Sequence, residues 1–555
     1  MTRPPARSPR ISLLFASLAV AAVAFAFTLK DENEYFYKVN RGLEVFGQVY
    51  REVSQNYVDT VDPDAFLSAG IDAMLKTLDP YTTFQRNDAN DVDLLTTGSY
   101  GGVGITVGMR DSVVTVTDVL DGYSAQQEGM RIGDRLNTIN GRNVEHGPID
   151  ALREYTRGEA GSTLTIGVMR DGRSQPILFK LTRETIRIRS VTLSRMLEGG
   201  IGYVRLERFS AAAGDEVRSA IRSLRADGDL HGIVLDLRDN PGGLLDEAVS
   251  VASLFLPSGS AVVSTRGRDS SDNRVYHTHD APIALGLPLI VLVNGNSASA
   301  SEIVAGAVQD LDAGVIMGTQ SYGKGLVQTV RRLPYDASLK ITTARYFTPA
   351  GRSIQKVDYA RQRSSNTRTS SPSLPFKTVA GRVVYEHGGI MPDSIVSDDI
   401  DPAIVAQLRD GGIFFKFATQ YSAPLSNIPE NFAVDNSLLE RFRSFALEDA
   451  HLRALDSAGF GYATELAAAA HRDGYAAALT SRIEEMVSAV RDEEGRQFDQ
   501  HREEIRRELQ DEIVARFRSQ RQRLSQSLSD DRLVLAAAAL LRDGHAAYGR
   551  LLGMR

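Results

Sequence analysis

The 555-residue sequence contains no cysteine, so neither a disulfide nor a thiolate metal site can form. Its nine histidines form no H-E-x-x-H motif and no other paired ligand spacing, so we expect no metal and no cofactor. His277 and His279 lie in a polar stretch where solvent is the expected partner. The net charge is −7 and no long basic run is present, which excludes nucleic acid as an expected partner.

Hydrophobic residues make up 42% of the chain and charged residues 24%, a balance typical of globular domains. Changes of pattern divide the chain into five parts. These are an N-terminal segment (1–30), a helical region (31–92), a β-rich domain (93–186), an α/β core (187–400) and a second helical region (401–555). The predicted fold class is therefore multidomain α/β, with a mixed sheet in the core and helical regions at both ends.

The N-terminal segment has the features of an export or anchoring signal. Arg3, Arg7 and Arg10 precede the uncharged apolar run Ile11–Leu29, which is long enough to span a bilayer as a helix. A cleaved signal peptide is the alternative, because Ala24–Ala26 resembles a small-x-small cleavage site. Both interpretations predict that the rest of the chain lies outside the cytoplasm, on the periplasmic side, with the membrane as a partner in the first case.

The stretch NGNSASASEIVAGAVQDLDAGVIMGTQSYGKGLVQ, residues 294–328, carries the strongest chemical signal. A serine-rich turn opens a predicted helix over Glu302–Gln309, and Lys324 follows within a Gly-Lys-Gly turn. A serine is a weak nucleophile until a base removes its proton, and a lysine can be that base when burial lowers its pKa. The pattern predicts serine hydrolase chemistry with Ser299 as nucleophile and Lys324 as base.

This stretch closely resembles the C-terminal processing peptidases, the tail-specific serine proteases. The family's nucleophile is the middle serine of S-A-S-A-S-E and its base is the lysine twenty-five residues on, which correspond to Ser299 and Lys324. The resemblance also implies that Gln328 supports the lysine and that Asp310 belongs with the dyad. Matches continue in Tyr346–Arg352 and in G-G-I-M-P-D near residue 390.

A second glycine-rich turn follows the predicted strand Gly232–Leu237, with the sequence R-D-N-P-G-G-L. Backbone N–H groups in such a turn can be aimed at a developing oxyanion. In the family resembled, this turn and the amide after the serine form the oxyanion hole. The resemblance gives this role to Gly242 or Gly243 and to Ala300.

Residues 96–186 alternate short β-rich runs with glycine turns. Gly101–Ile105, followed by G-D-R-L and I-N-G, looks like a PDZ domain. Free backbone N–H groups at Gly102, Val103, Gly104 and Ile105 can hold a peptide's terminal carboxylate, and the next strand can pair with the peptide. The expected partners are thus proteins or peptides with free C-termini.

The two helical regions are less informative. Leu43, Phe46, Tyr50, Val53 and Tyr57 recur at helical spacing and form one apolar face. The family often dimerises through a similar region, so a homo-oligomer is one expectation and packing on the protease core is the other. For residues 401–555 the pattern is helical but leaves bracing, oligomerisation and partner binding open.

The predicted function is endoproteolysis near the C-termini of extracytoplasmic proteins. One alternative is a membrane-tethered PDZ scaffold with an inactive protease core, which the intact serine, lysine, glutamine and glycine turn disfavour. Another is the PDZ-bearing protease class that uses His, Asp and Ser, but its G-N-S-G-G-P motif is absent.

Overall fold

The computed structural model describes residues 34–86, 98–335, 337–359, 374–386, 388–396, 402–448, 451 and 459–553. The chain divides into two compact units, one of residues 1–86 with Leu339–Ile341 and one of the remainder. The predicted anchor or signal at residues 11–29 lies outside the described residues. Within the described part of the chain, no helix is long and apolar enough to cross a membrane.

The first unit contains a helix over residues 34–56 and helix α2 (Pro63–Leu75), as the apolar spacing predicted. Part of the predicted apolar face packs inside this unit. The Tyr50 ring stacks on Phe66 at 5.8 Å, and its hydroxyl donates to the Pro63 carbonyl. Leu43 and Tyr57 remain more than half exposed.

The β-rich domain is an antiparallel sheet in the order β3-β4-β5-β7-β8, in which β3 is an edge strand. Alternate side chains of these strands face a core that contains Val114, Val116 and Leu164. Strands β2 and β9, at the two ends of the domain, pair with each other. The chain therefore enters and leaves this inserted domain at the same place. The elements are β2 (Ser99–Gly102), β3 (Ile105–Arg110), β4 (Val113–Val119), α4 (Ser124–Gln127), β5 (Arg135–Ile139), β6 (Arg142–Asn143), α5 (Ile149–Thr156), β7 (Thr163–Met169), β8 (Ile177–Thr182) and β9 (Glu184–Arg187).

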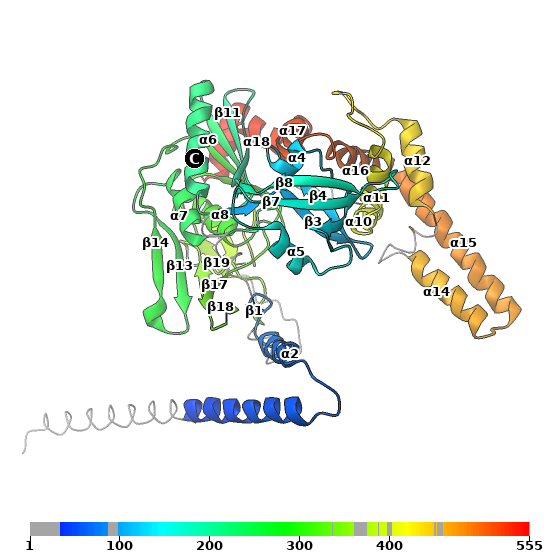
Figure 1. Cartoon of the computed structure of the whole chain (residues 1–555). Helices are drawn as coiled ribbons and strands as arrows, with labels where there is room; N and C mark the ends of the chain where they lie inside the picture. The colour runs from blue at the N-terminus through cyan, green and yellow to red at the C-terminus, as the bar shows by residue number, and fades with distance from the viewer. Residues whose placement is uncertain are drawn as a thin grey trace, which may run out of the picture. The chain divides into compact units, whose positions relative to one another are not determined.

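The protease core is built on a six-stranded mixed sheet in the order β10-β11-β12-β15-β16-β21. Strand β11 of this sheet is labelled in Figure 1. Only the β10–β11 pair is antiparallel; the other four pairs are parallel. Every residue of β12 and β15 is buried, as expected of central strands covered on both faces. The strands are β10 (Val191–Leu197), β11 (Ile201–Leu206), β12 (Gly232–Asp236), β15 (Leu289–Val293), β16 (Val315–Gly318) and β21 (Ser394–Ile395).

Alternation along each strand sends neighbouring side chains to opposite faces of this sheet. Leu289, Val291 and Val293 of β15 face a core shared with α6 (Ala213–Asp227), α7 (Leu245–Ser253) and α8 (Ala300–Asp310). Ile290 and Leu292 face a second core, whose other members include Leu533, Val534 and Leu541. The end of the chain therefore completes the protease core.

A second sheet lies beside the core. Strand β13 (Ala261–Gly267) pairs with β14 (Arg274–His277) and with β18 (Ala337–Phe347), and β18 also pairs with β17 (Leu326–Arg332). A short 3-10 turn, η1 (Ser270–Asp272), joins β13 to β14, and β19 (Leu374–Lys377) pairs with β20 (Val383–Glu386). His277, for which solvent was the expected partner, ends strand β14 and is exposed.

The C-terminal region is helical, as predicted, and has two parts. The first forms its own core, in which Phe414, Phe442 and Phe498 are buried. It contains α10 (Ala403–Asp410), α11 (Ile413–Ser422), α12 (Asn436–Ala446), α14 (Gly459–Arg472), α15 (Ala477–Gln500) and α16 (Arg502–Val514). The second part, α17 (Gln520–Ser527), α18 (Arg532–Asp543) and α19 (His545–Leu551), lies against the protease sheet.

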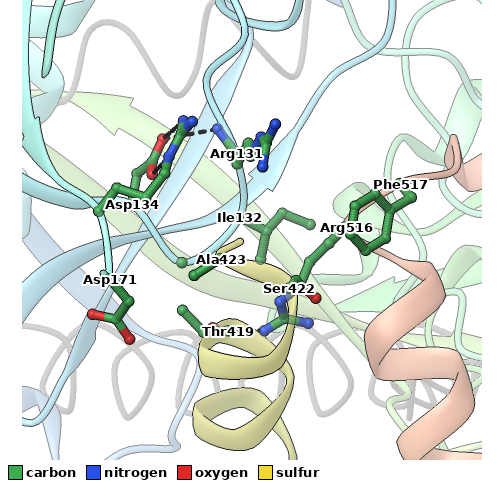
Figure 2. A pocket seen from close by; sticks show the side chains of 11 residues that line it. Arg131, Ile132, Asp134, Asp171, Thr419, Ser422, Ala423, Arg516 and Phe517 are labelled. Carbon is green, nitrogen blue, oxygen red and sulfur yellow. Dashed lines mark hydrogen bonds and ion pairs between the residues drawn. The ribbon is translucent and has the colours of Figure 1, made fainter. Parts of the chain in front are cut away.

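Helix α11 also contacts the β-rich domain (Figure 2). The Arg131 guanidinium donates to the Leu425 carbonyl at 2.8 Å, and Lys416 Nζ lies 2.9 Å from an Asp111 carboxylate oxygen. A Cβ on Gly133 would lie 2.5 Å from the Thr419 methyl, so the loop and the helix meet without space for a side chain. The helical region thus contacts both the inserted domain and the protease sheet.

Candidate active site

Ser299 lies between the end of β15 and the start of α8. Its φ of 56° and ψ of −112° are unusual for a residue with a side chain, and such backbone strain is concentrated at functional sites. Helix α8 begins at Ala300, so the first-turn N–H groups and the positive end of the helix dipole lie beside the serine.

Of the three serines in the motif, Ser299 alone is not fully buried. Ser297 and Ser301 are 0% exposed, and Ser299 is 8% exposed. The Ser297 hydroxyl donates to the Leu237 carbonyl and the Ser301 hydroxyl to the Asn240 carbonyl. Both neighbours therefore brace the turn, and Ser299 is the serine that a substrate can approach.

The glycine turn lies directly against the Ser299 turn because β12 and β15 are parallel neighbours, whose carboxyl ends meet at one edge of the sheet. The Ala298 N–H donates to the Asn240 carbonyl at 3.0 Å. A Cβ on Gly242 would lie 2.8 Å from Ser299 Cβ and 2.9 Å from the Ala300 nitrogen. Only glycine allows the two turns to come this close.

Gly242 and Gly243 differ in whether their backbone N–H group already has a hydrogen-bond acceptor. The Gly242 N–H donates to Asn240 Oδ1 at 2.9 Å. Gly243 forms a parallel bridge with Phe209, in which the Phe209 carbonyl accepts from Leu244, so the Gly243 N–H points away from that strand. Within the described part of the chain it has no acceptor, and the same is true of the Ala300 N–H. The geometry favours Gly243 over Gly242 as an oxyanion donor.

The turn that contains Lys324 is packed as closely against its neighbours as the glycine turn is. Lys324 is half-buried, and Gly323 has a φ of 88°. A Cβ on Gly323 would lie 2.6 Å from Lys356 Cβ, and one on Gly325 would lie 2.6 Å from the Gln355 nitrogen. The Tyr322 N–H donates to the Ser297 carbonyl at 3.0 Å, which connects this turn to the nucleophile turn.

Glu302 joins the two turns through its carboxylate. Its Oε2 accepts the N–H groups of Ser299 and Lys324, each at 2.9 Å. Its Oε1 accepts the Ser321 hydroxyl at 2.6 Å and the Gly323 N–H at 2.7 Å. Complete burial raises the pKa of Glu302 above its ordinary value, an effect that these four hydrogen bonds oppose. Sequence reasoning missed this role, although a glutamate three residues after the serine has the spacing of a capping box.

Gln328 lies close in sequence to Lys324, whereas Asp310 lies at the far end of α8. Gln328 is in β17, four residues after the lysine, and its side chain donates to the Leu326 carbonyl at 3.1 Å. Asp310 is the last residue of α8, so about ten residues of helix, roughly 15 Å, separate it from Ser299. There it is buried, forms an ion pair with Arg352 and accepts the Ala350 N–H at 2.9 Å. It anchors the turn after β18, at the opposite end of α8 from Ser299.

The inserted domain has a groove between β3 and α5, of about 200 Å³. Its lining includes Gly102, Val103, Gly104 and Ile105, the four residues of the predicted carboxylate loop, together with Ile149 and Arg157. The Val103 and Gly104 N–H groups have no acceptor among the described residues. The Arg157 guanidinium lies 5.1 Å from the Tyr100 ring centre. The groove thus combines an apolar floor, backbone donors and one cation.

Comparisons with known proteins show the family. Models for peptidase family S41, a PDZ domain and a probable PDZ-protease C-terminal helical domain match residues 200–360, 101–181 and 404–541. A carboxy-terminal-processing protease of Bartonella bacilliformis is 36% identical over 348 residues, which are 62% of this chain and 79% of that protein. The chain belongs to peptidase family S41. A probable CtpA-like serine protease of Staphylococcus aureus is 30% identical, over 62% of this chain and 70% of that protein.

Similar solved structures include the photosystem II D1 C-terminal processing protease, at 28% identity and a TM-score of 0.34, over 64% of this chain and 93% of that chain. The PDZ domain of a carboxy-terminal protease from Vibrio cholerae, solved with a peptide, covers 16% of this S41 peptidase at 22% identity and a TM-score of 0.16; the match includes 99% of that chain. The family models and the curated relatives show that the protein is a serine-type peptidase of the carboxy-terminal-processing group with a PDZ domain.

Proposed function

We propose that this peptidase cleaves extracytoplasmic proteins near their C-termini through a Ser299–Lys324 dyad. The observation that carries the proposal is the shared Glu302 oxygen, which accepts the main-chain N–H groups of both residues at 2.9 Å. Two turns that are twenty-five positions apart are thereby held at one point beside the glycine turn.

In the proposed mechanism, neutral Lys324 takes the Ser299 hydroxyl proton as Oγ bonds to the scissile carbonyl carbon. The N–H groups of Gly243 and Ala300 stabilise the oxyanion that forms. Lys324 then protonates the leaving amine as the C–N bond breaks. A water then attacks the acyl carbon and gives a proton to Lys324; the C–Oγ bond breaks, Oγ takes that proton from Lys324, and the new carboxyl terminus of the substrate is released. Gln328 supports the lysine turn, and Asp310 supports the fold around it.

The PDZ groove supports recognition of the substrate's tail. An extended peptide can add to the free edge of β3, while the N–H groups of Val103 and Gly104 donate to its carboxylate. The apolar floor fits an apolar terminal side chain, and Arg157 adds a positive charge at the same groove. The N-terminal residues 1–30 support an extracytoplasmic location, with the chain anchored in or released from the membrane.

A comparison of one peptide with a free and an amidated C-terminus tests both parts of the proposal. We expect the free form to be cleaved faster, because charge-assisted hydrogen bonds to a carboxylate are about twice as strong as neutral ones. Ile149→Glu, which places a negative charge in the groove, should remove the preference while leaving cleavage of a short peptide intact. Equal cleavage of both forms would refute tail recognition. No cleavage of any unfolded protein would favour the scaffold alternative.

A further inference from the structure

The glycine turn begins at Arg238, and this arginine is held by an aspartate from the other end of the chain. Asp531 lies 293 positions later, where it is the N-cap residue of α18. Its Oδ2 accepts from Arg238 Nη2 at 2.7 Å and its Oδ1 from Nη1 at 3.3 Å. Two parallel bonds of this kind fix the orientation of a guanidinium as well as its distance. No step of the mechanism above accounts for this contact.

On its other side, Arg238 folds back onto the strand that leads into the turn. Its Nε donates to Asp236 Oδ1 at 3.0 Å and its Nη2 to Asp236 Oδ2 at 2.7 Å. Asp236 ends β12, is 0% exposed, and also accepts the Tyr203 hydroxyl at 2.7 Å. Although burial alone would raise the pKa of Asp236, Arg238 and Arg205 hold that pKa below its ordinary value, so the carboxylate stays ionised. Arg238 is therefore held between two carboxylates, one from β12 and one from α18.

The residue after Arg238 connects the glycine turn to the nucleophile turn. Asp239 has a φ of 60°, and its Oδ1 accepts the side-chain amides of Asn294 and Asn296, each at 2.9 Å. Both asparagines belong to the turn that carries the nucleophile. Gly243, whose N–H group is the proposed oxyanion donor, lies four positions after Asp239. A displacement of Arg238 would therefore reach both groups through few bonds.

We infer that Asp531 is a positioning residue for the oxyanion site: acting through Arg238, it holds the glycine turn where the Gly243 N–H meets the developing oxyanion. The inference rests on the proposed function, because it takes that N–H group as an oxyanion donor. Such a donor is effective because it is aligned before the charge forms. Helix α18 thus contributes to the geometry of the active site as well as to the core beneath the sheet.

Asp531 has a second role, which mutation can separate from the first. As the N-cap of α18, its Oδ1 accepts the N–H groups of Leu533 and Val534 at 3.1 and 3.0 Å. Asparagine caps a helix about as well as aspartate does. It carries no charge, however, and has only one acceptor oxygen for the two Arg238 nitrogens. Asp531→Asn therefore keeps the cap and weakens the arginine contact, while Asp236 still neutralises the guanidinium.

Asp531→Asn in the full chain tests the inference. We expect kcat on a peptide to fall about tenfold or more with KM nearly unchanged, because an oxyanion donor acts on the transition state and not on the bound substrate. The labelling of Ser299 by a fluorophosphonate should slow by a similar factor. The matched control is Asp435→Asn, which makes the same change at the N-cap of α12, where Asp435 accepts the Leu438 N–H at 2.7 Å. It should keep wild-type kcat.

Two further variants separate positioning from folding. Leu541→Ala weakens the packing of α18 at the other end of the helix, so it should lower the melting temperature more than Asp531→Asn does and leave kcat per folded molecule unchanged. Arg238→Lys keeps the charge and loses the planar fork, so it should lower kcat in the same way. Because Asp531 acts through Arg238, the double variant should lose little more than either single one.

Wild-type kcat in Asp531→Asn would overturn the inference, as would losses that multiply in the double variant. An equal fall of kcat in Leu541→Ala would also overturn it, because Asp531 would then only stabilise the fold. Retained cleavage in Ser299→Ala would instead refute the dyad, so failure of the inference and failure of the proposed function are distinguishable.

Discussion

Ser299 and Lys324 donate their main-chain N–H groups to the same oxygen atom, Glu302 Oε2, each at 2.9 Å. The two nitrogens can therefore be no farther apart than twice that distance. Glu302 is fully buried and belongs to the first turn of α8, so it is fixed to the helix that the serine precedes. The Glu302 carboxylate therefore fixes the distance between the Ser299 turn and the Lys324 turn. The proposed serine–lysine reaction depends on that distance.

Glu302→Gln should therefore damage catalysis severely. An amide has one acceptor oxygen, and its NH2 group would face N–H donors, so at least one buried donor loses its partner at a cost of about 1–3 kcal/mol. We expect a loss of activity of more than about a hundredfold, because small displacements of reacting groups are costly. Peptide cleavage and fluorophosphonate labelling would measure it.

Glu247→Gln provides the control. Glu247 is a partly buried carboxylate in the first turn of α7 that accepts the Gly214 N–H at 2.8 Å. Its substitution should lower the melting temperature without lowering the activity of the folded enzyme. Normal kcat in Glu302→Gln would show that the separation of the two turns does not depend on the carboxylate.

Ser299→Ala and Lys324→Ala should each abolish cleavage while the chain stays folded. Residues that act as one unit show strongly non-additive effects, so the double variant should lose little more than either single variant. Peptide cleavage and a melting curve for all three proteins would test this. Because the hydroxyls of Ser297 and Ser301 are both committed to backbone carbonyls, neither should replace Ser299.

Asp310→Ala should act on stability more than on chemistry. It leaves the Arg352 guanidinium buried without its ion-pair partner, and breaking such a pair costs about 3–5 kcal/mol. We expect a large fall in melting temperature, with near-normal fluorophosphonate labelling per folded molecule. Gln328→Ala, at a partly exposed position four residues after the lysine, should show the reverse. A stable Asp310→Ala protein with no labelling would place Asp310 in the reaction.

The sequence supported much of this architecture because several patterns were strong and local. The strand predicted at Gly232–Leu237 is β12 (Gly232–Asp236), and the serine, lysine and glycine turns also occur where spacing predicted them. Glu302 was not recognised, because its role depends on a turn twenty-two positions away that only the folded chain brings near. The location of Asp310 at the far end of α8 follows from helix length, a constraint that family resemblance alone did not apply.

The surfaces that the helices of residues 401–555 cover could not be predicted from the sequence either. An amphipathic helix shows that it has an apolar face but not which surface covers that face. Here the two parts of one helical region go to different places: α10–α16 form a core of their own, whereas α18 and α19 cover one face of the protease sheet.

Leu541→Ala should consequently destabilise the protease and not only its C-terminal helix. Leu541 is 2% exposed and belongs to the core beneath the sheet, so truncation should cost about 2–5 kcal/mol. Leu535→Ala, on the same helix but 49% exposed, is the matched control and should change stability by less than about 0.5 kcal/mol. Denaturant unfolding would compare them. Equal stability of the two variants would contradict the packing of α18 on the sheet.

The last prediction concerns the contact between the inserted domain and α11. Gly133 has a φ of 94°, and a Cβ there would lie 2.5 Å from the Thr419 methyl and 2.7 Å from its hydroxyl. Gly133→Ala should therefore destabilise the protein through a backbone penalty and through a collision with α11. Thr419→Ala removes both colliding atoms but leaves the backbone penalty. The double variant should accordingly be more stable than the sum of the single effects predicts, by about 0.5–3 kcal/mol.

Gly129→Ala is the control for the backbone penalty, because Gly129 has a φ of 85° and open space at its Cβ position. Its effect should be additive with Thr419→Ala. Hydrogen exchange in α11 would locate the change: Gly133→Ala should increase exchange there and Gly129→Ala should not. Additive effects for Gly133 and Thr419, with unchanged exchange, would mean that the PDZ domain does not rest on the helical region in solution. A coupling confined to Gly133 would instead support the helical region as the element that holds the PDZ domain beside the protease.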